Sequence, residues 1–164
     1  MTKKIDVGIV MGSKSDLPVM QKVADVLDTL DIGYEMRILS AHRTPLQAKT
    51  WAETAKDRGI QVLICGAGMA AHLAGAVAAH SLLPVIGVPL GATLGGVDSL
   101  LSTVQMPPGV PVATVGIGSG GAKNAAWLAA RIISVHDSSV EARMKAAIED
   151  KRNQVLAQDA ELQK

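Results

Sequence analysis

Residues 5–30 of the chain read IDVGIVMGSKSDLPVMQKVADVLDTL, and this stretch decides the fold. Its first part, residues 5–11, is a short and largely apolar run, which is typical of a strand buried in a parallel sheet. A turn rich in glycine and serine follows at residues 12–16. Beyond it, large apolar residues recur at spacings of three and four, at Leu17, Met20, Val23, Leu27 and Leu30. This spacing predicts an amphipathic helix with Ser15 or Asp16 as its cap and Pro18 in its first turn.

The same alternation of strand and helix continues along the rest of the chain. Apolar runs predict further strands at 34–39, 60–65, 84–88 and 111–117. Helical patterns predict helices at 44–59, 69–80, 97–105, 121–135 and 138–158. We expect Thr44 to cap the helix that starts with Pro45, and Gly59 to end it. The sequence therefore predicts an α/β fold: a single domain over residues 1–164, with three α/β/α layers, a flavodoxin-like parallel sheet of about five strands and an extra C-terminal helix.

Composition limits the classes of partner. The chain has 164 residues, with 16 Lys plus Arg against 15 Asp plus Glu, so nothing in its charge favours binding to nucleic acid or to a membrane. Cys65 is the single cysteine, and no Cys/His cluster has the spacing of metal ligands, so we expect no metal site. The N-terminus lacks the apolar segment of a signal peptide, which predicts a cytoplasmic protein. Aromatic residues make up only 2% of the chain, and a homo-oligomer would add the apolar burial that they would otherwise supply.

In a sheet of this type, ligands bind beyond the carboxyl ends of the strands, where the strand order reverses. The loops at these ends are rich in Gly, Ser and other small residues, and they span 12–16, 40–43, 66–72, 89–96 and 118–121. We expect side chains from the first three loops to converge at one mouth. These three loops therefore hold the candidate site.

The second loop carries the most informative tetrapeptide, Ser40-Ala41-His42-Arg43. Histidine can exchange a proton near neutral pH, and the neighbouring guanidinium can bind a phosphate or carboxylate in two-pronged fashion. The pairing predicts an anion anchor with a proton shuttle. In the first loop, Ser13 and backbone N–H groups at a helix N-terminus favour a phosphate, although simple capping is an equal alternative. Asp16 is better suited to accepting hydrogen bonds from ribose hydroxyls.

The third loop, GAGMAA at residues 66–71, matches the loose dinucleotide-binding pattern. The acid that should follow about 20 residues later is missing, because residues 84–94 carry no charge. These glycines are better explained by a close approach of the backbone to a flat, compact ligand. His72 follows in an Ala-rich segment, where a lone histidine is more often structural than catalytic. His80 and His136 are weaker candidates still.

Several other functions lack their sequence signals. No G-x-S-x-G elbow and no Walker-type phosphate loop occurs. A receiver domain would need an acid after the third strand, where this chain has Cys65 and Gly66. An electron carrier of the flavodoxin type would need aromatic residues to stack on its flavin, and the chain has only two tryptophans and one tyrosine.

Four blocks, taken in order, closely resemble the bacterial PurE family, the N5-carboxyaminoimidazole ribonucleotide mutases of purine synthesis. They are MGSKSD at 11–16, SAHRTP at 40–45, GAGMAAHLAG at 66–75 and GVDSLLSTVQMPPGVPVATVGIG at 96–118. The resemblance keeps one register from Ile5 to about Arg131. One departure is Ala74, because the family usually has proline at this position.

The resemblance implies a reversible shift of a carboxylate from the exocyclic nitrogen of an aminoimidazole ribonucleotide to ring carbon C4, without ATP, metal or biotin. It implies His42 as general acid and base. It also implies a substrate-binding set of Gly12, Ser13, Asp16, Ser40, Arg43, Gly68, Ala70 and His72. In this set the phosphate lies on Ser13, Ser40 and Arg43, and the glycine loop covers the imidazole and encloses CO2.

The resemblance further implies an octamer with active sites at subunit junctions, in which the C-terminal helix, about 138–160, packs on a neighbouring subunit. It implies a functional link to an ATP-dependent synthetase that makes the carbamate substrate. Two alternatives remain open. One is a carboxylase that takes free CO2, although that branch usually has lysine where this chain has Arg43. The other is a nucleotide-binding module without catalysis.

Overall fold

The computed structural model describes residues 4–91 and 93–163 of the chain. Its strands form one parallel sheet in the order β2-β1-β3-β4-β5. The strands are β1 (Val7–Met11), β2 (Tyr34–Ile38), β3 (Val62–Ala67), β4 (Val85–Pro89) and β5 (Ala113–Thr114). The chain adds β2 on one side of β1 and the remaining strands on the other, so the order reverses between β1 and β3. This is the flavodoxin-like order, and it confirms the predicted fold class.

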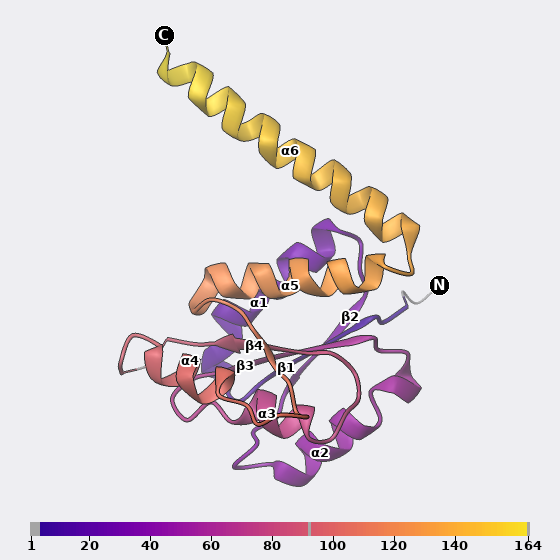
Figure 1. Cartoon of the computed structure of the whole chain (residues 1–164), viewed down its shortest axis with the longest axis vertical. Coiled ribbons are helices and arrows are strands. Elements are labelled where there is room, and N and C mark those ends of the chain that lie inside the picture. The colour runs from indigo at the N-terminus through magenta and orange to yellow at the C-terminus, as the bar shows by residue number, and fades with distance from the viewer. Residues whose placement is uncertain (1–3, 92, 164) are drawn as a thin grey trace.

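Helices cover both faces of the sheet (Figure 1). One face carries α1 (Leu17–Thr29) and α5 (Gly118–Ser134), and the other carries α2 (Pro45–Glu53) and α3 (Leu73–Ala78). The helix α4 (Val97–Val104) lies beside β4 and β5. The last helix, α6 (Ser138–Leu162), starts against α5 and then extends away from the sheet. Two short 3-10 turns, η1 (Lys14–Asp16) and η2 (Lys56–Arg58), complete the elements.

The central strand β1 shows why the apolar runs become strands. All five of its residues are buried. Val7, Ile9 and Met11 belong to the core under α1 and α5, whereas Val10 belongs to the core under α2 and α3. Because side chains alternate across a strand, a strand with helices on both faces must be apolar at every position. No helix among residues 4–91 and 93–163 is both long enough and apolar enough to cross a membrane.

Several predicted boundaries are wrong in instructive ways. The helix expected over 69–80 is only Leu73–Ala78. Met69 cannot belong to it, because its left-handed backbone conformation (φ 55°) does not fit a right-handed helix. The helix expected over 44–59 stops at Glu53 and continues only as the turn η2. Gly59 ends this turn with φ 88°, as predicted. The fifth strand has two residues instead of seven, and α5 begins at Gly118.

The predicted residues Thr44 and Asp16 stand at the N-cap positions of α2 and α1, but neither side chain makes a capping hydrogen bond. Thr44 makes no capping bond to α2; its hydroxyl accepts from the backbone N–H of Ser40 (2.8 Å) and donates to the carbonyl of Ser40 (3.1 Å). Neither predicted side chain caps α1. Instead, Ser13 and Asp16 form a capping box around η1, in which Asp16 accepts from the N–H of Ser13 (3.0 Å). Polar side chains of both loops are thus used to shape the loops themselves.

Candidate active site

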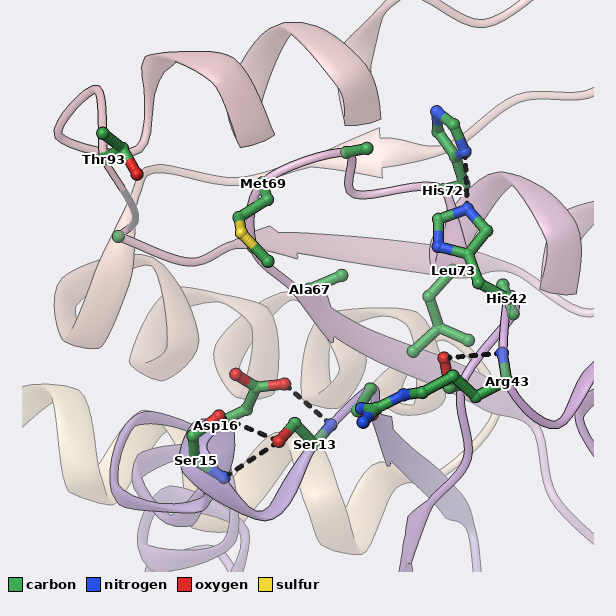
Figure 2. Close-up of a pocket in the computed structure, with 16 residues that line it drawn as sticks. Ser13, Ser15, Asp16, His42, Arg43, Ala67, Met69, His72, Leu73 and Thr93 are labelled. Atoms are coloured by element: carbon green, nitrogen blue, oxygen red, sulfur yellow. Dashed lines mark hydrogen bonds between the residues drawn. The ribbon is translucent and has the colours of Figure 1, made fainter.

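A pocket of about 630 Å³ opens at the carboxyl ends of β1, β2 and β3 (Figure 2). It is lined by Gly12, Ser13, Ser15, Asp16, Ser40, Ala41, His42, Arg43, Ala67, Gly68, Met69, Ala70, His72, Leu73, Gly91 and Thr93. The first three strand-end loops converge here, as predicted, and the fourth contributes its beginning. The loop at 118–121 is not among the lining residues. All nine residues that the sequence predicted for the site lie in this pocket.

Two histidines meet at one side of the pocket. His42 Nε2 lies 2.9 Å from His72 Nδ1, and the two rings meet edge to face with centroids 5.0 Å apart. A hydrogen bond at this distance needs one donor and one acceptor, so at least one of the two imidazoles is neutral. Both side chains are exposed to the pocket, and the other edge of His42 faces its middle (Figure 2). The sequence favoured a structural His72, but the structure places its ring against His42.

Arg43 bridges two of the loops. Its guanidinium donates to the carbonyl of Gly12 (2.9 Å), and its backbone N–H donates to the hydroxyl of Ser40 (3.2 Å). Figure 2 shows the side chain reaching from the second loop toward Ser13. Guanidinium carries five N–H donors, so a single bond to Gly12 leaves donors for an anion placed between the loops.

Asp16 lies opposite the histidines, in the loop that starts at Gly12. Burial raises the pKa of its carboxyl above the ordinary value, while hydrogen bonds from Ser13 and Ser15 and the charge of Arg43 offset part of the rise. The hydroxyls of Ser13 and Ser15 are hydrogen-bonded to each other at 2.9 Å. This loop therefore offers both hydroxyl groups and a partly buried carboxylate to a ligand.

The third loop supplies a surface of backbone and small side chains. It carries Ala67, Gly68 and Ala70 along the pocket, so a planar ligand can approach the main chain closely. Gly66, the first residue of this loop and part of β3, lets the end of the strand approach α1, since a Cβ there would lie 2.2 Å from the sulfur of Met20. Close backbone packing, rather than dinucleotide binding, explains this glycine.

Some lining residues were not predicted. Met69 and Thr93 face the pocket, but only the loops that carry them were identified from the sequence. His80 lies outside the pocket, 3.8 Å from Glu53, and His136 does not line it either, as their weaker ranking implied. Among residues 4–91 and 93–163, no group of three His, Cys, Asp or Glu side chains is placed to hold a metal ion.

Comparison with known proteins agrees with the loop motifs. The family model described as AIR carboxylase matches residues 6–154. The chain is 56% identical over 145 residues to the N5-carboxyaminoimidazole ribonucleotide mutase of Pyrococcus abyssi, covering 88% of this chain and 82% of that protein. It is 51% identical over 157 residues to the protein of the same name from Bacillus subtilis, covering 95% and 97%.

A solved structure, that of PurE from Treponema denticola, superposes with a TM-score of 0.86 at 32% identity and covers 96% of this chain and 98% of that one. The resemblance of the four sequence blocks is thus confirmed, and the chain belongs to the AIR carboxylase family.

Proposed function

We propose that this protein is an N5-carboxyaminoimidazole ribonucleotide mutase, an isomerase that converts this carbamate into 4-carboxy-5-aminoimidazole ribonucleotide. The observation that carries the proposal is the arrangement of His42 and Arg43, which are neighbours in one loop and face one pocket of about 630 Å³. The names of the curated relatives support the same reaction.

The substrate's fixed part binds to the first two loops. Its phosphate lies between Ser13, Ser40 and Arg43, which bring two hydroxyls and a guanidinium to the pocket. Asp16 accepts from the ribose hydroxyls. The aminoimidazole then lies over Gly68 and Ala70, within reach of His42. The phosphate anchors the nucleotide and takes no part in the reaction.

The first half of the reaction removes the carboxylate from nitrogen. Protonated His42 gives its proton to the exocyclic nitrogen while the N–C bond of the carbamate breaks and CO2 leaves. The bonding electrons stay on nitrogen, and without this proton they would form a costly amide-like anion. The products are aminoimidazole ribonucleotide, CO2 and neutral His42.

The second half builds the new bond. C4 of the imidazole carries enamine-like electron density and attacks the carbon of CO2. The resulting C4–H proton then moves to His42, which restores both the aromatic ring and the protonated catalyst. Because CO2 stays beside its acceptor, the step avoids a bimolecular recapture. The carboxylate leaves and returns as CO2, so the cycle consumes no ATP.

The main competing function is direct carboxylation of aminoimidazole ribonucleotide by free CO2, which the description of the matched family favours. The arginine after His42 favours the mutase. Purified protein should be assayed with the carbamate substrate and, separately, with aminoimidazole ribonucleotide plus bicarbonate. We expect efficient turnover only of the carbamate; faster carboxylation from bicarbonate would establish the alternative. Binding without turnover in both assays would indicate a non-catalytic nucleotide-binding module.

The proposed reaction also suggests which partners the protein has. The carbamate must be supplied by an ATP-dependent carboxylation of the amine, so we propose a functional link to the synthetase that performs it. We further propose a homo-octamer, acting in the cytoplasm on a small ribonucleotide. Neither a metal nor another cofactor takes part in the proposed chemistry.

A further inference from the structure

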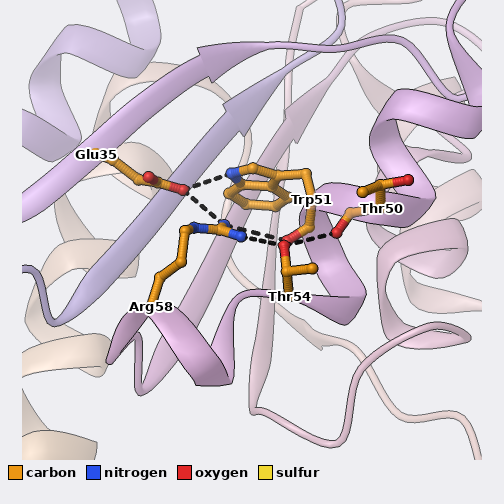
Figure 3. A network of polar contacts seen from close by, with 5 residues as sticks. All are labelled: Glu35, Thr50, Trp51, Thr54 and Arg58. Carbon is orange, nitrogen blue, oxygen red and sulfur yellow. Dashed lines mark hydrogen bonds and ion pairs between the residues drawn. The ribbon is translucent and has the colours of Figure 1, made fainter.

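A cluster of polar contacts joins β2, α2 and η2 (Figure 3). The indole N–H of Trp51, in α2, donates to Oε1 of Glu35, in β2, at 2.5 Å. Arg58, in η2, donates to the same oxygen at 2.8 Å. Trp51 is 5% exposed, and the side chains of Glu35 and Arg58 are 19% and 33% exposed. One carboxylate oxygen, partly shielded from solvent, thus joins a strand, a helix and a turn.

The tryptophan ring also spans two strands. Gly8 of β1 and Glu35 of β2 are partners in the sheet register. A Cβ at Gly8 would lie only 2.9 Å from the Trp51 ring, so the ring rests directly on the backbone of β1. Its N–H meanwhile points to the neighbouring strand at the same level. Arg58 completes the cluster with a bond to the carbonyl of Trp51 (3.1 Å) and a contact with Thr54.

Helix α2 depends on this cluster for its position. The other buried residues of α2 are Ala48 and Ala52, whose side chains bury little area. The strand that carries Glu35, β2, is an edge strand that pairs only with β1 among the described residues. Trp51 is therefore the one large side chain that fixes α2 against the sheet.

The loop that carries His42 is joined by hydrogen bonds to the N-terminal end of α2. Thr44 bonds to both the N–H and the carbonyl of Ser40, and the Arg43 N–H donates to the Ser40 hydroxyl. The first turn of α2 follows directly after these hydrogen bonds, since the N–H of Ala48 donates to the carbonyl of Thr44 (3.1 Å). A displacement of α2 would therefore act directly on the loop that carries His42.

We propose that Trp51 and Glu35 are positioning residues for His42 and Arg43. By holding α2 on the edge of the sheet, their hydrogen bond keeps the imidazole against His72 and the guanidinium on Gly12. The inference rests on the proposed function for its kinetic consequence. A misplacement of about 1 Å at a reacting group can cost roughly a hundredfold in rate, so a loosened α2 should be measurable.

Two variants test the hydrogen bond. Trp51→Phe keeps the ring beside Gly8 but removes the N–H, and Glu35→Ala removes the acceptor. We expect each to lower kcat/KM for the carbamate by roughly ten- to a hundredfold, with kcat reduced and KM raised. Glu35→Gln keeps an acceptor for the indole and should retain activity within about threefold of the wild type. If Trp51→Phe does not fold, Glu35→Ala decides, because it leaves the ring in place.

Two controls separate positioning from stability. Glu53→Gln removes an exposed carboxylate from the same helix, one that pairs with Lys49 at 3.7 Å, and should leave kcat and KM unchanged. Ile133→Val weakens the core on the opposite face and should lower only the melting temperature. If Trp51→Phe and Glu35→Ala lower only the melting temperature, as Ile133→Val does, and keep the wild-type kcat and KM when assayed well below that temperature, the positioning role is wrong.

A second readout does not need turnover. The imidazole 1H–15N resonances of His42 and His72 should be assigned with His→Asn variants and compared in wild type, Trp51→Phe and Glu53→Gln. We expect both sets to shift in Trp51→Phe and neither in Glu53→Gln. Unchanged resonances would overturn the inference whatever the enzyme's activity. Shifted resonances in a protein without mutase activity would support it and refute the proposed function alone.

Discussion

His42 faces the middle of the pocket and is the residue on which the proposed chemistry depends most. Replacing it with asparagine keeps a polar side chain of similar size but cannot carry a proton between N and C4. We expect His42→Asn to lose at least the ~10² to 10⁴ in rate that general acid–base catalysis contributes, while nucleotide affinity stays within several-fold. Product absorbance and calorimetric binding check the two parts. Turnover close to that of the wild type would refute the assignment.

Arg43 should act on binding rather than on chemistry. Its fork donates to Gly12 and has further N–H groups for a phosphate, whereas lysine offers a single point of charge. We expect Arg43→Lys to raise KM about tenfold or more with a smaller change in kcat. Lys14→Gln, which alters an exposed cation of the neighbouring loop that does not line the pocket, is the matched control. An unchanged KM in Arg43→Lys would remove the arginine from the phosphate site.

Asp16 predicts a pH effect on stability. Burial raises the pKa of its carboxyl in the folded protein above its value in the unfolded chain. The folded state therefore holds this proton more tightly, and ionisation of Asp16 costs stability as the pH rises through this pKa. Asp16→Asn removes that ionisation. We expect the difference in melting temperature, variant minus wild type, to become more positive between about pH 3.5 and pH 7. A difference that falls with pH would contradict the raised pKa.

At this scale the sequence predicted which residues come together in one pocket better than which contacts they make there. All nine predicted site residues line the pocket because strand-end loops of a parallel sheet must meet at one edge. The bond between His42 and His72 was not predictable, since it joins residues 30 positions apart through the left-handed turn at Met69. The N-cap position of Thr44 was predicted correctly, but its hydroxyl makes no capping bond because it is hydrogen-bonded to Ser40 instead.

Among the helices, α5 contains a position where the structure has no room for any side chain. It begins with the residues GSGG at 118–121, and a Cβ on Gly121 would lie 1.6 Å from the carbonyl oxygen of Gly116. Backbone cannot retreat as a flexible side chain can. We expect Gly121→Ala to destabilise the protein by about 3 kcal/mol or more.

Gly120→Ala is the matched control, because a Cβ there meets nothing within 4 Å. The substitution should stabilise α5 by up to about 1 kcal/mol through helix propensity. Urea unfolding of both variants measures the two changes. Equal stabilities for the two alanine variants would show that α5 does not approach Gly116 as closely as the structure indicates.

Elements with a strong periodic pattern were predicted well, and weakly patterned ones were not. The strands β1, β3 and β4 are buried apolar runs, and their positions follow from composition alone. The Ala-rich stretch around α3 has high helix propensity throughout, so propensity could not show that the chain turns at Met69 first. At β5, apolar residues continue beyond the two that pair with β4.

On the scale of the whole molecule, α6 is the feature that one chain does not explain. It is 25 residues long, but only Val140 and Met144 are buried. Its outer half exposes Val155 (64%), Leu156 (56%) and Leu162 (85%), and it extends away from the sheet (Figure 1). An isolated helical segment has little stability in water without packing, so exposed apolar residues on such a segment favour a covering surface.

We therefore expect α6 to pack on a second copy of the chain, within the homo-octamer proposed above. The double variant Val155→Lys/Leu156→Lys places two charges on the exposed apolar residues and should shift the mass in light scattering to smaller species. The variant Gln154→Lys/Gln158→Lys adds the same charge to polar, exposed positions of the same helix segment and should keep the wild-type mass. Because the proposed active sites lie at subunit junctions, the smaller species should also lose activity. A monomeric wild type, or a Val155→Lys/Leu156→Lys variant with the wild-type mass, would show that α6 does not hold the subunits together.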